Sequence, residues 1–582
     1  MSYFVISMIK PPTPYPIGSI GSCFPNVCTN DTLALALKEL IRQIFPFIPP
    51  SEKIHLSIID SKSFNQKVHE TFYGFYICIS CFIIYIFIVV AATIRKYYIV
   101  WFQKKKQSQS ESTALIIFNC FNLKDNIEGI VKTENRVDSK LNTLQFLRCV
   151  GMFWVVVGHS FLFSIIGSTS NFKEAIKQIV EDKGMAILRN GTISVDMFFI
   201  LGGFLSTMAF VSSFEKEKMR TVKNLLLLYF HRYVRLFPMM FLCWAITSYL
   251  LPIVSNGINT TSVQIMQHQC KSRFVETFLY IDNYLIDMNS FCNGWIWYLY
   301  IDMQLFILTP LIVYPAMKNN SLGILVLILL SVASYGYQIY LFQSQNMPAS
   351  VLNMPSNYDK VYYQQLYTRC NVYFVGVFFC YLYLQFKGKK LFQSPLLKWI
   401  NEQFKNRVIR YIISLSGLGM MLFVIFAQNW FDHSQTPIPQ YQSTLFLLFD
   451  RVLFGLGMLF LVYPTFVCFS RPVCSFFSYP LFNIMGKITY GTYMIHLLIM
   501  TYMGAIIMNS FVYSFYPLMI HSISMFFLSY VVSFVITAVF ESPFVQLLKL
   551  LNQSQSKPSI QKKNQEKLLE VIIEDKQKEE KQ

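Results

Sequence analysis

Residues 141–161 read LNTLQFLRCVGMFWVVVGHSF. This stretch is apolar over the length that an α-helix needs to cross the hydrocarbon core of a bilayer, which is about 20 residues. It nevertheless contains two ionisable side chains, Arg148 and His159. Because a charged side chain at the centre of a membrane helix costs roughly 2.5–3.5 kcal/mol on insertion scales, such residues usually serve a function. The stretch therefore predicts a transmembrane helix that carries part of a functional site.

Apolar runs of this kind recur along the whole chain. Hydrophobic residues make up 54% of the 582 residues and charged residues only 14%, too few to cover the surface of a soluble protein of this size. We therefore predict an all-α polytopic membrane protein with about eleven transmembrane helices, integral to the plasma membrane or to an endomembrane. The expected spans are 73–94, 144–166, 193–213, 225–251, 295–314, 322–341, 370–386, 409–430, 445–469, 481–508 and 517–540.

The positions of the basic residues predict the orientation of these spans. The net charge is +18, and Lys and Arg concentrate in connectors such as 95–106 and 387–407, whereas 431–444 contains neither. Because cytosolic connectors are enriched in Lys and Arg, this pattern places the N-terminus in the lumen or outside the cell and the C-terminus in the cytosol. Lysines beside the spans suit anionic lipid headgroups, and we expect no nucleic-acid partner.

These assignments divide the chain into five parts. Residues 1–72 form a short lumenal or extracellular segment, and 73–94 form the first transmembrane helix. A basic cytosolic loop at 95–140 then leads to a membrane domain of about ten helices at 141–548. A charged cytosolic tail follows at 549–582.

Four cysteines and three glycosylation sequons fall in polar segments on the predicted lumenal side, where oxidation is possible. The cysteines are Cys23, Cys28, Cys270 and Cys292. Four cysteines allow three pairings, of which we favour the local pairs Cys23–Cys28 and Cys270–Cys292. The sequons are at Asn30, Asn190 and Asn259.

Arg148 and His159 have a spacing that places them on one face of their helix. They are eleven residues, or about three turns, apart, which corresponds to roughly 16 Å along the axis. Arg148 lies near the predicted cytosolic boundary, where an arginine suits a substrate that bears phosphate. His159 lies deeper, where an imidazole suits the removal of a proton from a nucleophile. The alternative is an arginine that reaches the membrane surface and a histidine that only packs.

Three further groups of polar residues occur in or beside other spans. Arg232 and Arg235 lie on one face at the cytosolic start of the fourth span, as a phosphate clamp or as interfacial anchors. Tyr298 and Asp302 share a face in the fifth span, and the carboxylate of Asp302 needs a partner there, either structural or catalytic. His496 lies in the tenth span, three residues after a tyrosine.

The remaining charges in the spans predict structural roles. Asp196, Arg369, Asp450 and Arg451 are further charges in spans or at span edges and are possible pairing partners, and Glu541 is interpreted as a cap or anchor at the end of the last span. The histidines in the spans lack neighbouring ligands at short spacing, so no metal site is predicted.

Six segments in order resemble the membrane acyltransferase-3 family, and specifically its eukaryotic nose-resistant-to-fluoxetine-like branch. They are LNTLQFLRCVGMFWVVVGHS, SVDMFFILGGFL, RYVRLFP, WIWYLYIDMQLFILTP, ITYGTYMIH and ESP, and they span 141–548. The N-terminal GSCFPNVCTNDT resembles the end of the cysteine-rich extracellular domain of that branch. One departure is Gly202, where the family usually has serine.

The resemblance implies an enzyme that transfers an acyl group, typically acetyl, from cytosolic acyl-CoA to a hydroxyl of a carbohydrate, lipid or other acceptor. Acyl-CoA would be a donor substrate, and no permanently bound cofactor is expected. The alternative implied by the same branch is a transporter of lipids or small molecules that has no enzymatic activity.

The resemblance also assigns a role to each candidate residue. Arg148 would hold a phosphate of CoA, with Arg232 and Arg235 assisting. His159 would act as the general base on the acceptor hydroxyl or carry the acyl group briefly. The residues that would orient His159 or line the path of the acceptor are Asp302, Tyr298 and His496.

Overall fold

The structure is a computed structural model of the chain. It describes residues 2–9, 16–24, 55–102, 112–132, 142–215, 221–255, 257, 260–284, 292–352, 355, 357–389, 394–434, 436–466, 475–477, 479–507 and 511–551.

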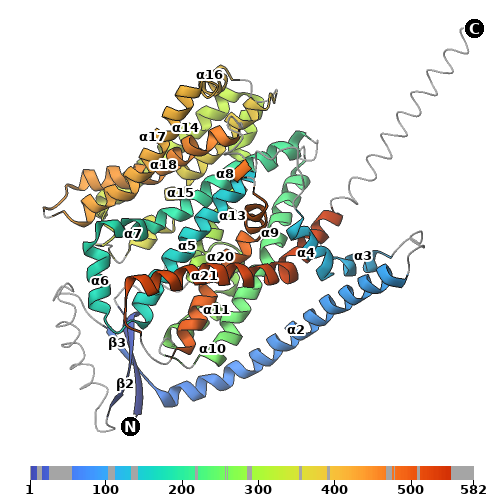
Figure 1. Cartoon of the computed structure of the whole chain (residues 1–582), viewed down its shortest axis with the longest axis vertical. Coiled ribbons are helices and arrows are strands. Elements are labelled where there is room, and N and C mark those ends of the chain that lie inside the picture. Colours follow the sequence, from blue (N-terminus) through green and yellow to red (C-terminus); the bar gives the residue numbers. More distant parts are fainter. Residues whose placement is uncertain are drawn as a thin grey trace, which may run out of the picture.

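Long helices make up the membrane part of the molecule (Figure 1). They are α2 Ser61–Phe102, α5 Asn142–Ser168, α8 Ser194–Glu215, α9 Val222–Ala245, α13 Trp297–Lys318, α14 Asn320–Ser344, α15 Leu366–Phe386, α17 Arg407–Asp432, α18 Gln440–Phe466, α20 Pro480–Ile506 and α21 Phe515–Ile536. Each predicted span coincides with one of these helices, so the helical membrane class is confirmed, with a small sheet as the only β-structure among the described residues.

Nine helices in the described part of the chain are long and apolar enough to cross a membrane by length and composition. The two predicted spans that fall outside this set, α15 and α20, are helices that carry buried polar side chains, including Arg369 and His496. A helix shielded by its neighbours does not need an apolar surface all round. The count of about eleven spans therefore stays a prediction.

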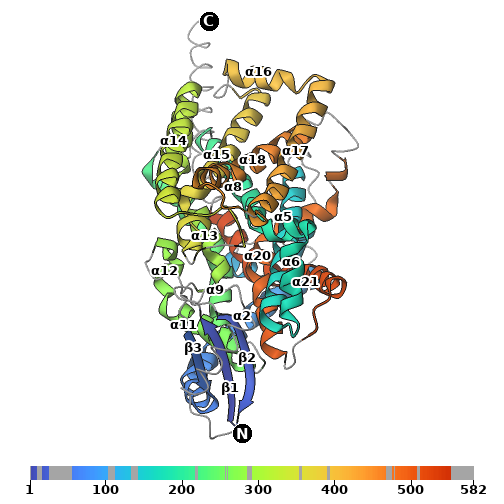
Figure 2. The same ribbon diagram turned by 90° about the vertical axis from the view of Figure 1, so that its left-hand side faces the viewer.

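The core of the bundle surrounds α20. This helix packs against α5, α9 and α21, and it lies near the centre of the molecule in both views (Figure 2). Beside it, α8 and α15 approach each other closely because Gly203 and Gly376 have no side chain in the contact. A Cβ at either glycine would overlap the backbone of the opposite helix. Such small-residue contacts are typical of helix pairs in membranes.

A small antiparallel sheet precedes the first long helix. Its strands are β1 Ser2–Ile9, β2 Pro16–Phe24 and β3 His55–Asp60, in the order β2-β1-β3. The sheet and α6 Phe172–Glu181 lie on the lower left of the bundle, and α3 Thr113–Asn119 and α4 Leu123–Val131 lie on its right (Figure 1). Segments predicted to be lumenal and segments predicted to be cytosolic thus occupy opposite sides. Which of these sides faces the cytosol stays a prediction.

The long helix α2 lies at the edge of the bundle and touches α21 near its end. The Tyr85 hydroxyl donates a hydrogen bond to the carbonyl oxygen of Val539 at 2.7 Å. Val539 belongs to η10 Thr537–Glu541, a single π-helical turn that continues α21. Turns of this type leave carbonyl groups for other donors and are frequent at functional sites. The same turn ends at Glu541.

Several short helices complete the chain. They are η2 Lys183–Met185, α7 Ala186–Arg189, η3 Asn190–Ile193, η4 Ile246–Leu250, α10 Leu251–Val254, α11 Thr260–Ser272, α12 Phe274–Phe278, η5 Asp282–Tyr284, η7 Gly294–Ile296, η8 Asp359–Tyr363 and α16 Pro395–Gln403.

In the predicted cytosolic loop, α4 is held at its C-terminal end by Lys487 of α20. The ammonium group of Lys487 donates to three backbone carbonyls there, at 2.9–3.0 Å. Part of this loop therefore folds against the bundle.

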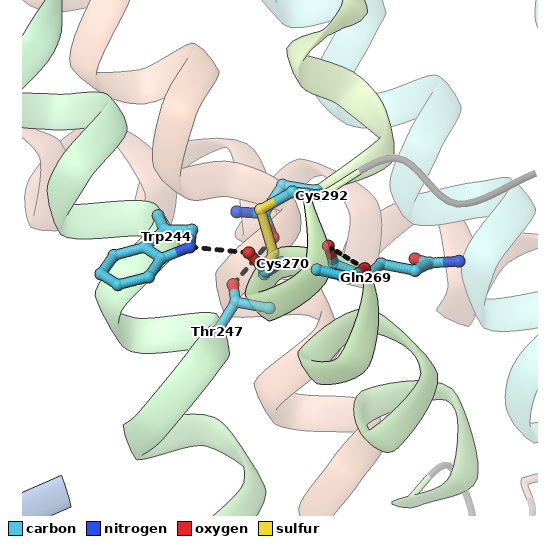
Figure 3. Close-up of a disulfide and its surroundings, with 7 residues drawn as sticks. Trp244, Thr247, Gln269, Cys270 and Cys292 are labelled. Carbon is cyan, nitrogen blue, oxygen red and sulfur yellow. Dashed lines mark hydrogen bonds between the residues drawn. A yellow bond between two sulfur atoms is a disulfide. The ribbon is translucent and has the colours of Figure 1, made fainter. Parts of the chain in front are cut away.

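A disulfide joins the end of α11 to the start of the segment before α13. The predicted pair Cys270–Cys292 is present, with Trp244 donating to the carbonyl oxygen of Cys270 at 2.9 Å (Figure 3). The Thr247 hydroxyl donates to the side-chain oxygen of Asn293 at 2.7 Å. Trp244 thus attaches the end of α11 to α9, and Thr247, two residues beyond α9, attaches the segment before α13. The predicted pair Cys23–Cys28 lies outside the residues whose side chains are described.

The sequons have different outcomes. Asn30 and Asn259 lie outside the described residues. Asn190 is buried, and its side-chain amide donates to the carbonyl oxygen of Val424 at 3.3 Å. A glycan needs a surface asparagine, so the burial of Asn190 argues against this sequon, and glycosylation stays a prediction.

The segment between α12 and η5 reaches down the side of α13. The side-chain amide of Gln304 donates to the carbonyl oxygen of Tyr280 at 2.7 Å and to the side-chain oxygen of Asn283 at 2.8 Å. Gln304 is seven residues beyond Trp297, the first residue of α13, and therefore about 10 Å further along its axis. Part of the connection between the predicted spans 225–251 and 295–314 thus packs along the side of α13.

We expect Asp282 to make stability depend on pH. Burial raises the pKa of its carboxyl group from 3.8 to about 6, although Arg273 opposes the shift and Glu276 adds to it. The folded protein holds this proton more tightly than the unfolded chain does, so the free energy of unfolding falls as the pH rises from about 4 to about 6. A shift of one pKa unit corresponds to about 1.4 kcal/mol.

The pH dependence can be measured by thermal unfolding of the purified protein. The melting temperature of wild type should fall more steeply than that of Asp282→Asn between about pH 4 and pH 6, because asparagine does not titrate. Parallel curves for the two proteins would contradict the assignment.

Candidate active site

The helix α5 carries both residues that the sequence singled out. It runs without a break from Asn142 to Ser168, so Arg148 and His159 are separated by about 16 Å along one helix. Arg148 lies near Arg235, Tyr298 and Asp302. His159 contacts His496 of α20. The two residues therefore face the interior of the bundle at different depths.

His159 and His496 form a hydrogen-bonded pair. Nδ1 of His159 lies 3.0 Å from Nε2 of His496, and the ring centroids are 5.3 Å apart. Nδ1 of His496 lies 2.7 Å from the carbonyl oxygen of Tyr493. The sequence placed both histidines in spans, but it could not pair them, because they are 337 positions apart.

The contacts of this pair determine which nitrogen atoms carry protons. A carbonyl oxygen only accepts, so Nδ1 of His496 must be the donor to Tyr493. In a neutral His496, Nε2 then has a lone pair and accepts from the Nδ1–H of His159. Neutral His159 consequently has its lone pair on Nε2. This is the atom that a general base uses.

Only one member of the pair is accessible. His496 is fully buried, whereas His159 is partly exposed. A Cβ at the preceding residue, Gly158, would meet no atom within 4 Å, which indicates open space beside this turn of α5. Of the two histidines, His159 is therefore the one that we expect to meet a substrate. We expect His496 to position the ring of His159 and not to contact the substrate itself.

The sequence predicts that the carboxylate of Asp302 needs a partner, and that partner is Arg232. Arg232 of α9 donates to the carboxylate of Asp302 on α13, and its guanidinium lies 4.2 Å from the centre of the Phe306 ring. The side chain of Asp302 is 8% exposed, so this pair is largely shielded from water. Its charges balance each other. Arg232 therefore has less positive charge to offer a ligand than expected.

Arg148 has no such partner. Its guanidinium donates to the side-chain oxygen of Gln145 at 3.1 Å, and no described carboxylate lies within 4.0 Å of it. Arg235 lies nearby and makes only a loose pair with Glu541, at 3.9 Å. The side chain of Arg235 is 57% exposed. Arg148 and Arg235 together leave positive charge for which an anion is the natural complement.

Two tyrosines link the arginine cluster to the histidine pair. Tyr298 interacts with the charges of Asp302, Arg232 and Arg148. Its ring centre lies 5.3 Å from that of Tyr493, which in turn lies 5.7 Å from the ring of His496. Tyr493 is fixed by a hydrogen bond from its hydroxyl to the backbone of Trp295. The candidate residues therefore line one continuous region of the bundle.

Gly202, the departure from the family pattern, lies at this region. A Cβ on Gly202 would come 3.2 Å from Oδ1 of Asp302 and 3.6 Å from the ring of Tyr373. A serine at this position would place its hydroxyl beside the carboxylate of Asp302. The glycine at this position therefore leaves Asp302 without a hydroxyl partner that a serine would offer.

Glu541 was interpreted as a cap or anchor, but it lies in the site. Glu541 is 3% exposed, and one of its carboxylate oxygens makes the loose pair with Arg235. The other oxygen has no hydrogen-bond partner among the described residues. The sequence feature that could have pointed to Glu541 as part of the site is an acidic residue at the end of an apolar span. Among the described residues, no three His, Cys, Asp or Glu side chains come together as a metal site.

The charges ranked as pairing partners form a separate buried group. Nη1 of Arg369 donates to both carboxylate oxygens of Asp196, at 2.7 and 2.8 Å, and both side chains are fully buried. Nε of Arg451 lies 3.8 Å from the same carboxylate. Asp450 accepts a hydrogen bond from the Tyr362 hydroxyl at 2.9 Å. This group connects α8, α15 and α18, and it is structural.

The fold and the site define a multi-pass membrane protein with a shielded ionisable site among its helices. Residues 141–540 match the family model described as an acyltransferase domain. This match covers more than half of the chain, and the chain belongs to the acyltransferase-3 family. The resemblance inferred from the six sequence segments is confirmed.

Two relatives from Caenorhabditis elegans are similar to this chain. "Nose resistant to fluoxetine protein 6" is 22% identical over 586 residues, which covers 93% of this chain and 67% of the relative. "Regulator of hypoxia-inducible factor 1" is 22% identical over 410 residues, which covers 66% of this chain and 74% of the relative. No solved structure matches the chain at a significant level.

Proposed function

We propose that the protein is a membrane-bound O-acyltransferase. It would transfer an acyl group, with acetyl as the first candidate, from cytosolic acyl-CoA to a hydroxyl of a carbohydrate, lipid or other acceptor. Membership of the acyltransferase-3 family supports the transfer reaction in general. The observation that supports this form of it most is the accessible His159, whose Nε2 has a free lone pair because His496 accepts from Nδ1.

The chemistry follows from that lone pair. Nε2 of His159 removes the proton of the acceptor hydroxyl as the oxygen attacks the carbonyl carbon of the thioester. The new carbon–oxygen bond forms, the carbon–sulfur bond breaks, and the proton on Nε2 passes to the departing thiolate. The products are the acyl ester and free CoA. His496 keeps the imidazole oriented throughout.

The donor would enter at the arginine cluster. Arg148, assisted by Arg235, would bind a phosphate group of CoA near the predicted cytosolic boundary. The flexible arm of CoA would then extend about 16 Å along α5 toward His159. Arg232 would act mainly by fixing Asp302, and Tyr298 would line the path between the two ends.

Removing Arg148 should weaken the binding of CoA. We expect Arg148→Ala to raise the dissociation constant for CoA about ten- to hundredfold, because a hydrogen bond to a charged group contributes about 1.5–3 kcal/mol. Arg148→Lys should show a smaller loss, since lysine keeps the charge but not the paired donors. Binding is measured by calorimetry on the protein in detergent.

A matched control is Arg407→Ala. Arg407 lies at the start of α17, where its guanidinium is 5.7 Å from the ring of Tyr411. This variant should bind CoA as wild type does. Equal affinity in wild type and Arg148→Ala would contradict the proposed donor site. Lack of CoA binding by wild type, together with movement of a lipid across vesicle membranes, would favour a transporter.

A further inference from the structure

The short segment before α13 is held in place by the disulfide and by a tight turn. Cys292 is bonded to Cys270 at the end of α11 (Figure 3). Asn293 follows with a backbone φ of 53°, in the left-handed region that asparagine tolerates better than most residues. Its side-chain oxygen accepts the hydrogen bond from the Thr247 hydroxyl, and both residues are fully buried. These contacts fix the path of the chain into Trp295.

Trp295 makes two hydrogen bonds to α20. Its indole N–H donates to the carbonyl oxygen of Met494 at 3.2 Å, and its own carbonyl oxygen accepts from the Tyr493 hydroxyl. A tryptophan at the end of a span is often an anchor at the membrane surface, with its ring among the lipid headgroups. Trp295 is only 7% exposed, so its ring packs inside the bundle instead. Its two bonds therefore hold one turn of α20.

The same turn of α20 determines the direction of His496. The carbonyl oxygen of Tyr493 accepts a hydrogen bond from Nδ1–H of His496 at 2.7 Å. Nε2 of His496 in turn accepts from Nδ1–H of His159. Tyr493 is thus bonded through its side chain to Trp295 and through its backbone to His496. A continuous series of bonds leads from the disulfide-held segment to the ring of His159.

We propose that Trp295 and Tyr493 are positioning residues that hold the His159–His496 pair in its reactive orientation, with the disulfide as their support. The inference rests on the proposed function, because it takes His159 as the base. Proton transfer requires the base and the donor atom to lie within about 2.6–3.2 Å of each other, so a misdirected lone pair lowers the rate. Loosening this turn should therefore slow acyl transfer and leave donor binding at the distant Arg148 unchanged.

Removal of one hydroxyl tests the proposal. Tyr493→Phe loses the bond to Trp295 and keeps the ring. We expect its maximal rate of acetyl transfer to fall about fivefold, while the KM for acetyl-CoA stays within about twofold of wild type. Trp295→Phe, which loses the indole donor to Met494, should give a fall of similar size.

The matched control is Tyr490→Phe. Tyr490 also lies on α20, and its hydroxyl donates to a backbone carbonyl of a neighbouring helix, that of Leu236 on α9, at 2.7 Å. It makes the same kind of bond, but neither its side chain nor its carbonyl is bonded to His496. The maximal rate of this variant should stay within about twofold of wild type.

A double-mutant cycle separates positioning from general support of the fold. If Tyr493 acts through His496, adding Tyr493→Phe to His496→Ala should slow the reaction less than about twofold further, because the histidine pair is already lost. A hydroxyl that only stabilises the fold would lower the rate by the same factor in both backgrounds. Replacement of Cys270 and Cys292 by serine should follow the same pattern as Tyr493→Phe.

The outcomes distinguish this inference from the proposed function. A wild-type protein that transfers no acetyl group would exclude both. An active wild type with a fully active Tyr493→Phe variant would overturn the positioning role alone, and so would equal effects of Tyr493→Phe in the two backgrounds. Tyr493→Phe decides the question even if the serine variant does not fold, since phenylalanine keeps the packing of the ring.

Discussion

The His159→Ala protein is expected to fold and to bind CoA, but to transfer acyl groups about 10²–10⁴ times more slowly than wild type. General base catalysis accounts for rate changes of that size, and His159 is the residue whose Nε2 we propose as the base because its Nδ1 is bonded to His496. The dissociation constant for CoA should stay within about twofold, because Arg148 lies roughly three turns away on α5. Single-turnover kinetics with acetyl-CoA measure the rate.

Substitution of the partner histidine distinguishes positioning from catalysis. In His496→Ala, the Nδ1–H of His159 loses its acceptor, so the ring can rotate and its protons can redistribute. The maximal rate should fall about tenfold, with the KM for acetyl-CoA unchanged. The fall should also be smaller than that caused by His159→Ala. Full activity of a well-folded His159→Ala protein would exclude His159 as the base.

A second substitution, at Arg369, is expected to have a large effect on the stability of the folded protein. Arg369→Leu should lower the free energy of unfolding by about 3–5 kcal/mol, because it leaves the carboxylate of Asp196 buried without its main partner. The same substitution removes two hydrogen bonds, at 3.1 and 2.8 Å, that the guanidinium donates to the carbonyl oxygen of Tyr363. Thermal unfolding in detergent should show a large decrease in melting temperature.

A double variant shows whether the lone carboxylate is the cause. Adding Asp196→Leu to Arg369→Leu should recover part of the lost stability, since replacement of a whole buried pair by apolar residues is often tolerated. Arg451 makes the recovery incomplete, because its Nε lies 3.8 Å from Asp196 and would lose that contact. An Arg369→Leu protein as stable as wild type would show that the pair contributes little.

The positions of the helices could be predicted from the sequence because lipid exposure requires long apolar runs. The same reasoning could not detect the π-helical turn at Thr537–Glu541, since a local change in hydrogen bonding leaves the apolar pattern unaltered. It also could not show that Tyr280 lies beside Gln304, because this contact depends on the path of a connecting segment. Such features are decided by tertiary packing.

The candidate site, too, could be predicted from the sequence only in part. Spacing predicted which face of α5 carries Arg148 and His159, because the turn of a helix is fixed. Spacing within one helix cannot identify the helix opposite, so the pairs Arg232–Asp302 and His159–His496 required the structure. The need of Asp302 for a partner could be predicted, since an unpaired carboxylate is costly in a membrane.

The central claim is that this chain uses acyl-CoA as an acyl donor with His159 as the base. The most direct measurement follows purified protein in lipid vesicles that receives acetyl-CoA labelled in its acetyl group. Our account predicts that label leaves CoA and appears in an ester, with one free CoA thiol released for each ester formed, and that both processes nearly stop in His159→Ala. Bound acetyl-CoA that releases no more thiol in wild type than in His159→Ala would contradict it.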